Sequence, residues 1–105
     1  MKLATFSHDG TTTWGALTDA GLVDLRQALD GRYPSIRDLL AADGLAQAKA
    51  ALSRNLRAIP LDEVTFLPVI PNPDKIVCAG VNYEEHRIEA NIRASQYPTI
   101  FLRVP

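Results

Sequence analysis

A histidine and a glutamate stand three positions apart near the end of the chain, at His86 and Glu89. On a helix, residues three apart are neighbours, so the carboxylate can orient or charge the imidazole. Such a pair can take a proton from water or from an acidic carbon of a substrate, and Tyr83 could add its hydroxyl from the same ridge. The spacing also fits a solvated pair on an exposed helix face, so both interpretations stay open.

The elements that must position this pair follow from the residues around it. A short apolar run over residues 75–81 is typical of a strand buried on both faces of a sheet. Asn82 then makes a good helix N-cap, with Glu85 placed to reach back to its N–H. The pattern predicts a helix from residue 83 to about residue 94, and another strand over residues 99–104.

The first part of the chain indicates a small antiparallel sheet. Asp9-Gly10 separates two β-compatible runs, and this dipeptide is a strong signal for a tight hairpin because Gly accepts a positive φ. A second turn cluster over residues 18–21 leads into a third run. We therefore predict a meander of three strands, over residues 2–7, 11–17 and 21–24.

Two helices are expected after the meander. Ser35 followed by Asp38 resembles a capping box with a short acid, and Gly44 can end the helix that it begins. A second, longer helix is indicated by apolar residues that recur at spacings of three and four and that end before Pro60: Leu45, Ala48, Leu52, Leu56 and Ile59.

The domain organisation follows from a change in composition. Four prolines between residues 60 and 73 exclude a continuous helix or a central strand there. We predict an α+β chain, with a small N-terminal domain over residues 1–59, a proline-rich connector over residues 60–74, and the incomplete start of a second domain over residues 75–105.

Composition excludes several classes of protein. The 105 residues are 47% hydrophobic with a formal net charge of −1, and no basic stripe is present, so nucleic acid and anionic membranes are not expected partners. The single Cys78 can form neither an internal disulfide nor a thiolate metal site. We therefore expect a cytoplasmic protein that does not span a membrane.

One segment of the chain resembles a known family. The run Cys78-Ala79-Gly80-Val81-Asn82-Tyr83-Glu84-Glu85-His86-Arg87-Ile88-Glu89 is similar to the signature Gly-x-Asn-Tyr-x-x-His-x-x-Glu that opens the catalytic domain of the fumarylacetoacetate hydrolase family. The flanks over residues 71–76 and 98–103 are also similar. Residues 1–6 and 14–25 more loosely resemble the small N-terminal domain of many bacterial members.

The resemblance implies an enzyme that needs Mg²⁺ or Mn²⁺ and acts on a small oxo-acid by C–C bond hydrolysis, decarboxylation, isomerisation or dehydration. It implies a homo-oligomer with a mixed β-roll catalytic domain, and a place in aromatic compound catabolism. His86 would be the general base and Glu89 its partner. Substrate contacts would come from the pocket wall at Gly80, Asn82 and Tyr83, and from Arg103, which stands where members usually have Lys.

The resemblance also implies that the metal-binding carboxylates lie downstream of residue 103. We therefore expect the chain to be the N-terminal part of a longer enzyme, to bind no metal and to be inactive alone. A non-catalytic binding or oligomerisation module is the alternative.

Overall fold

The computed structural model describes residues 1–93 and 97–104, and these form two compact units, Met1–Pro71 and Asn72–Pro105. Helices and antiparallel strands occur in both units, which confirms the predicted α+β class. No helix within the described residues has the length and apolar character needed to cross a membrane.

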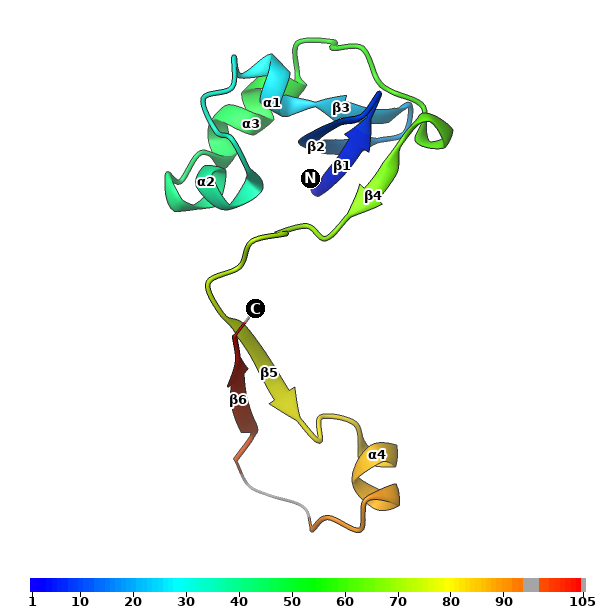
Figure 1. The fold of residues 1–105 in the computed structure, drawn as a ribbon, viewed down its shortest axis with the longest axis vertical. Coiled ribbons are helices and arrows are strands. Elements are labelled where there is room, and N and C mark those ends of the chain that lie inside the picture. Colours follow the sequence, from blue (N-terminus) through cyan, green and yellow to red (C-terminus); the bar gives the residue numbers. More distant parts are fainter. Residues whose placement is uncertain (94–96, 105) are drawn as a thin grey trace. The chain divides into compact units, whose positions relative to one another are not determined.

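The first unit is built on a four-stranded antiparallel sheet (Figure 1). Its spatial order is β3-β2-β1-β4, and the strands are β1 (Lys2–His8), β2 (Thr11–Thr18), β3 (Gly21–Asp24) and β4 (Thr65–Leu67). Asp9 and Gly10 both have positive φ, of 48° and 73°, as a tight hairpin turn requires. The predicted meander of three strands is therefore confirmed.

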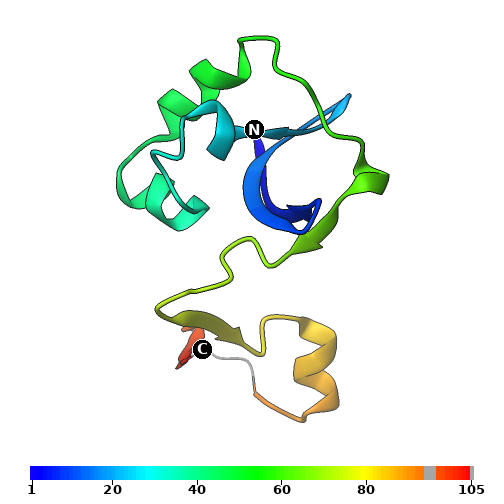
Figure 2. The same cartoon turned by 45° about the horizontal axis from the view of Figure 1, so that its top comes forward.

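Three short helices lie together beside this sheet in both views (Figures 1 and 2): α1 (Leu25–Ala28), α2 (Ile36–Ala41) and α3 (Leu45–Leu52). The predicted cap of α2 is confirmed, since the Asp38 N–H donates to the Ser35 hydroxyl oxygen over 3.2 Å. Helix α1 was not predicted, and it begins where Asp24 Oδ1 accepts the Gln27 N–H over 2.8 Å. The first unit thus has three helices where two were expected.

The core of the first unit lies between the sheet and these helices. Its buried members are Trp14, Ala16, Val23, Leu25, Tyr33, Ile36, Leu39, Ala48 and Ala51. The Trp14 indole N–H donates to the Tyr33 carbonyl oxygen over 2.8 Å, so a buried donor and a buried acceptor satisfy one another. This bond ties the loop before α2 to the centre of the sheet.

The predicted long helix over residues 45–59 is wrong in its second half. Helix α3 ends at Leu52, and Asn55 has a left-handed φ of 54°, a conformation that Asn tolerates and that a helix cannot continue through. Ile59 instead forms an isolated antiparallel bridge with Leu22, through backbone hydrogen bonds of 2.7 and 2.9 Å. Its apolar side chain fits the helical spacing, but its backbone extends the sheet edge.

The predicted connector over residues 60–74 contains structure of its own. A 3₁₀ turn, η1 (Leu61–Glu63), precedes β4, and β4 pairs with β1 from Thr5↔Leu67 to Ser7↔Thr65. The first unit therefore continues to Pro71, twelve residues beyond the predicted boundary at residue 59. The prolines lie on either side of β4 and none lies within it, so all three of its residues keep their backbone donors.

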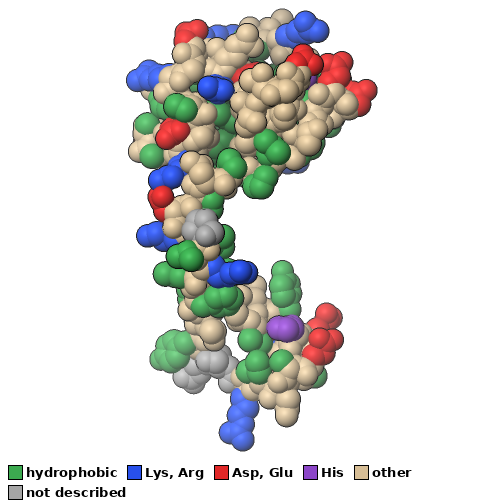
Figure 3. Space-filling model, in the orientation of Figure 1, with side chains coloured by type: hydrophobic (Ala, Val, Ile, Leu, Met, Phe, Trp, Pro, Cys, Tyr) green, Lys and Arg blue, Asp and Glu red, His purple; other side chains and the backbone are tan. Residues whose placement is uncertain are grey.

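The second unit consists of β5 (Ile76–Gly80), α4 (Glu84–Glu89) and β6 (Thr99–Arg103), in the predicted order of strand, helix and strand. The strands pair antiparallel from Ile76↔Arg103 to Gly80↔Thr99. The prediction that the first strand is buried on both faces is wrong for this structure, because its side chains are exposed or half-buried. Hydrophobic side chains lie at the surface of this unit (Figure 3). The larger β-roll stays a prediction.

Both predicted ends of α4 are corrected by the structure. Tyr83, not Asn82, is the N-cap, because Val81 takes a left-handed φ of 52° and turns the chain before the helix begins. The helix ends at Glu89 rather than near residue 94, which itself lies outside the described residues. Asn91, with φ 52°, donates to the Ile88 carbonyl, and the Ile92 N–H donates to the Arg87 carbonyl, so the helix closes in a Schellman motif.

Candidate functional site

A hollow of about 280 Å³ lies in the second unit, where β5, α4 and β6 meet. Gly80 and Asn82 line it from the end of β5 and the turn that follows, and Thr99 lines it from the start of β6. Helix α4 contributes Glu84 and Arg87. Of the predicted site residues, the structure thus gathers Gly80 and Asn82 around one space.

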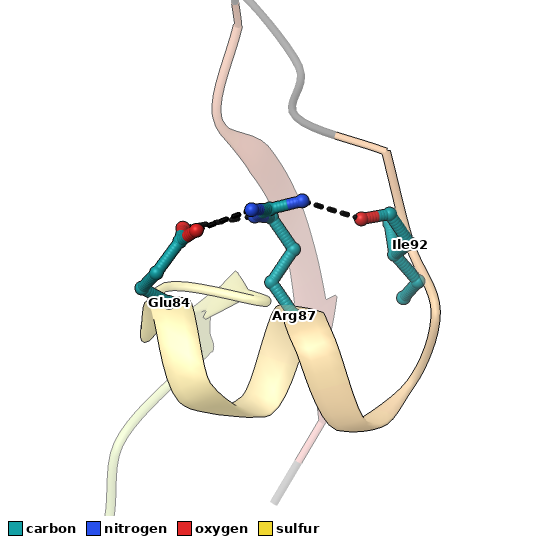
Figure 4. A network of polar contacts seen from close by, with 3 residues as sticks. All are labelled: Glu84, Arg87 and Ile92. Atoms are coloured by element: carbon teal, nitrogen blue, oxygen red, sulfur yellow. Dashed lines mark hydrogen bonds and ion pairs between the residues drawn. The ribbon is translucent and has the colours of Figure 1, made fainter.

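The side of α4 that faces this hollow carries a polar network (Figure 4). The Arg87 guanidinium donates from both Nε and Nη2 to the Glu84 carboxylate, with 2.9 Å between Nε and Oε2. Its Nη1 donates to the Ile92 carbonyl oxygen over 2.8 Å. Arg87 therefore connects the first turn of α4 to the backbone just beyond its last turn.

The electrostatic consequence falls on the two charged partners. Hydrogen bonds from Arg87 hold the pKa of the Glu84 carboxyl below its ordinary value of 4.5. The same bonds from the other side raise the pKa of Arg87 above its ordinary value, so its charge is fixed at any ordinary pH. The pair is thus ionised throughout the physiological range.

His86 and Glu89 lie on the same helix but not on the side of the hollow. Three residues along an α-helix correspond to an angular separation of about 60°, so the two side chains are neighbours. Together they point about 160° away from the direction shared by Glu84 and Arg87. Both are exposed, and within residues 1–93 and 97–104 no hydrogen bond or ion pair joins them. An exposed imidazole beside a carboxylate can exchange a proton with a group that approaches this face.

Tyr83 and Arg103 are placed apart from the hollow. Tyr83 is the N-cap of α4 and its side chain is exposed. Arg103 pairs with Ile76 at the far end of the two strands from Gly80, about 13 Å away along the strand. The described residues therefore do not form a single pocket that contains all six predicted positions.

No set of three His, Cys, Asp or Glu side chains that could hold a metal ion occurs in the described part of the chain. Helix α4 carries four Glu or His side chains, but the Glu84 carboxylate is already hydrogen-bonded to Arg87. The residues present therefore do not fit the Mg²⁺ or Mn²⁺ that the family resemblance implies.

A second hollow, of about 520 Å³, lies in the first unit and includes His8. The His8 Nε2 atom lies 3.7 Å from Asp9 Oδ2 and 3.6 Å from Glu63 Oε2. The contact with Glu63 brings the end of β1 next to η1, just before β4.

The Glu84–Arg87 pair is not among the site residues that the sequence predicts. The available signal was the placement of opposite charges three positions apart, with the acid nearer the helix start, a spacing that favours contact on a helix. The same spacing in His86 and Glu89 predicts a functional pair, because imidazole and carboxylate together can transfer a proton. Arg87 is therefore added to the candidate site, as the residue that contacts both the Glu84 carboxylate and the Ile92 carbonyl.

Comparison with curated proteins identifies relatives along most of the chain. The chain is 37% identical over 84 residues to human "Oxaloacetate tautomerase FAHD2A, mitochondrial", a match that covers 77% of the chain and 26% of that protein. It is 44% identical over 57 residues to rat "Oxaloacetate tautomerase Fahd2a, mitochondrial", covering 54% of the chain and 18% of the relative. A "Fumarylacetoacetate hydrolase domain-containing protein 2 homolog" from Dictyostelium discoideum is 29% identical over 91 residues, covering 83% and 30%.

These matches limit what is carried over. No family model matches the chain. The chain spans about a quarter of the length of the human relative that it matches, so the activity of a whole enzyme does not follow from the match alone. The aligned part of the chain is homologous to these relatives, and the chain therefore belongs to the fumarylacetoacetate hydrolase family.

Proposed function

We propose that this chain is part of an enzyme that interconverts the keto and enol forms of a small oxo-acid, with oxaloacetate as the substrate. The similarity to proteins named as oxaloacetate tautomerases carries this proposal. The His86–Glu89 pair on α4 supplies a chemistry that fits it. Tautomerisation is proposed over the C–C bond hydrolysis of the family resemblance, because the relatives' names specify it.

The reaction needs one proton to move. Keto–enol tautomerisation removes a proton from C3 of oxaloacetate and adds a proton to the oxygen on C2, with no net loss of atoms or electrons. His86 is the group proposed to accept the C3 proton, and Glu89 is its partner, which orients the ring and stabilises the imidazolium. A proton then returns to the C2 oxygen from the imidazolium or from solvent.

The substrate must also be held while its proton moves. We propose Gly80, Asn82 and Tyr83 as the residues that contact the oxo-acid. Gly80 and Asn82 line the hollow, whereas Tyr83 and the His86–Glu89 pair lie outside it, so the proposal requires these groups to come together around one substrate in the whole enzyme. Arg103 is the cation proposed to bind a carboxylate of the substrate. In this structure Arg103 lies about 13 Å along the strand from the level of Gly80, farther than the length of a four-carbon oxo-acid, so its role depends on the reach of its long side chain.

The divalent metal enters this proposal only as an expectation for the whole enzyme. The described residues offer no site for it, so its ligands would come from outside the part of the chain that the structure describes. We also propose that the enzyme is a homo-oligomer. The cytoplasmic location stays a prediction, whereas the rat and human relatives are named as mitochondrial.

The experiment is an assay of the full product of the gene that encodes this chain. Oxaloacetate enol absorbs in the ultraviolet, so its conversion to the keto form can be followed directly, with Mg²⁺ present. We expect His86→Gln to lower kcat by a factor of about 10² or more, the range of general acid–base catalysis, and Glu89→Gln to lower it less. Glu85→Gln is the matched control on the same helix. Equal rates for all three variants would exclude the proposed pair.

A non-catalytic binding module is the second candidate, and a specific observation favours it. Exposed apolar side chains lie on both strands of the second unit: Ile76, Val77, Ile100, Phe101 and Leu102. Such a surface suits contact with another polypeptide. A gene product that lacks tautomerase activity but forms a stable complex through this sheet would support the module over the enzyme.

A further inference from the structure

Helix α4 lacks the packing that holds most short helices in place. It has six residues, none of them buried. Isolated helices shorter than about 12 residues are marginal in water, and most helices in proteins are stabilised by an apolar face that packs on a core. Something other than core packing must therefore hold α4 in its helical form.

The contacts of Arg87 supply that stabilisation. Its guanidinium is bidentate on the Glu84 carboxylate in the first turn, and its third contact is the Ile92 carbonyl oxygen after the last turn. Backbone bonds close the same region, since the Ala90 N–H donates to the His86 carbonyl and the Ile92 N–H donates to the Arg87 carbonyl. One side chain thus connects both ends of the helix.

The environment of Arg87 also suits it to connect the two ends of α4. Its side chain is 25% exposed, while the Glu84 side chain is 67% exposed, so the guanidinium lies against the hollow rather than in open water. A planar guanidinium can reach a carboxylate with two donors and a carbonyl with a third, and a lysine ammonium cannot match that geometry. The network therefore depends on arginine at this position.

We propose that Arg87 is a positioning residue for the His86–Glu89 pair. His86 and Glu89 are neighbours only while residues 84–89 are helical, because an extended backbone would separate them by about 10 Å. Arg87 points to the opposite side of the helix and acts on the pair through the helix backbone. The predicted effect of Arg87 on catalysis rests on the proposed function. The predicted effect of Arg87 on the stability of α4 does not depend on any activity.

The first arm of the test measures the helix on the 105-residue chain by NMR. Arg87→Gln and Glu84→Gln are expected to raise the hydrogen-exchange rates of the Ala90, Asn91 and Ile92 amides by about threefold or more, the range of an exposed ion pair. Both are expected to weaken the nuclear Overhauser contact between the side chains of His86 and Glu89. Glu85→Gln changes the same charge on the same helix without touching Arg87, so its rates should equal those of the wild type.

The second arm measures catalysis on the full gene product. Arg87→Gln is expected to lower kcat for oxaloacetate tautomerisation by about tenfold with KM changed less than twofold, and Arg87→Lys to recover part of the loss. Amides of β5 and β6 serve as the internal reference for folding. The proposal would be overturned if Glu84→Gln and Glu85→Gln had the same exchange rates. It would also be overturned if Arg87→Gln lowered kcat without changing the exchange rates of the helix. A wild-type product without activity would refute the proposed function, and the first arm would still decide the role of Arg87.

Discussion

The hydroxyl of Thr5 on β1 donates to the carbonyl oxygen of Val69 over 2.7 Å, across 64 positions of the sequence. Together with the pairing of β4 on β1, this bond holds the segment after β4 against the first strand of the chain. The proline-containing stretch up to Pro71 is thereby part of the first unit.

Limited proteolysis should therefore release a fragment that ends near residue 71. Backbone that is hydrogen-bonded in a sheet is a poor protease substrate, whereas exposed segments between compact units are cut first. Mass spectrometry of the early products should show cleavage within residues 72–76 and not within residues 60–70. Early cleavage between residues 60 and 64 would restore the shorter domain that the sequence predicts.

Gly15→Ala should destabilise the first unit strongly. A Cβ added at Gly15 on β2 would lie 1.9 Å from the carbonyl oxygen of Val23 on β3, so the two strands would have to separate. A loss of about 3 kcal/mol or more is expected in urea unfolding followed by Trp14 fluorescence. Gly10→Ala is the matched control, because nothing lies within 4 Å of its added Cβ. Its positive φ of 73° should cost only about 1 kcal/mol.

The Glu84–Arg87 link should be lost at low pH and not at high pH. Because the pKa of Glu84 is lowered in the folded chain, the link contributes stability above the ordinary value of 4.5, and that stability disappears as pH falls through the lower folded pKa. The Arg87 Nε–H resonance, followed by NMR from pH 7 to pH 2, should move with a midpoint below 4.5. In Glu84→Gln the same resonance should show no such transition.

The 105-residue chain should bind Mg²⁺ weakly. Mg²⁺ needs several oxygen ligands at close range, and the described residues contain no cluster that could provide them. Isothermal titration should give a Kd of about 1 mM or weaker. Binding at micromolar Mg²⁺ would show that carboxylates of this chain converge in a way that the structure does not contain.

Self-association should run through the second unit. Val77 and Leu102 face one another across β5 and β6, and their exposed fractions are 62% and 65%. Exposed apolar strands of this kind favour pairing between chains. Sedimentation velocity should show mass that rises with concentration for the wild type and falls toward the monomer for the double variant Val77→Lys with Leu102→Glu. The control is Leu40→Glu on α2, which should leave association unchanged.

Local chemistry explains which parts of the fold the sequence predicts. The hairpin at Asp9-Gly10 and the cap at Ser35 depend on a few adjacent residues, and both are present as expected. Helix α1 had a signal of the same kind, since Asp24 and Gln27 stand at capping distance. That signal was hidden because Asp24 also ends a strand.

Contacts distant in sequence explain the failures. Leu56 and Ile59 fit a helical stripe, but the bridge between Ile59 and Leu22 depends on a partner 37 positions away. At the candidate site, the sequence indicates His86 and Glu89 through their chemical types. It does not reveal the contact of Arg87 with the Ile92 carbonyl, because that depends on where α4 ends, at the closing motif with Asn91.

The pairing of β5 with β6 also bears on the order in which the chain folds. The hairpin of β1 and β2 closes over two residues, Asp9 and Gly10, whereas Gly80 and Thr99 close a connection over residues 81–98. The longer closure costs about 2 kcal/mol more in chain entropy, and it gains few buried apolar side chains in return. The first unit should therefore nucleate while the second is still unpaired, and refolding should proceed in two kinetic phases with the meander in the faster one.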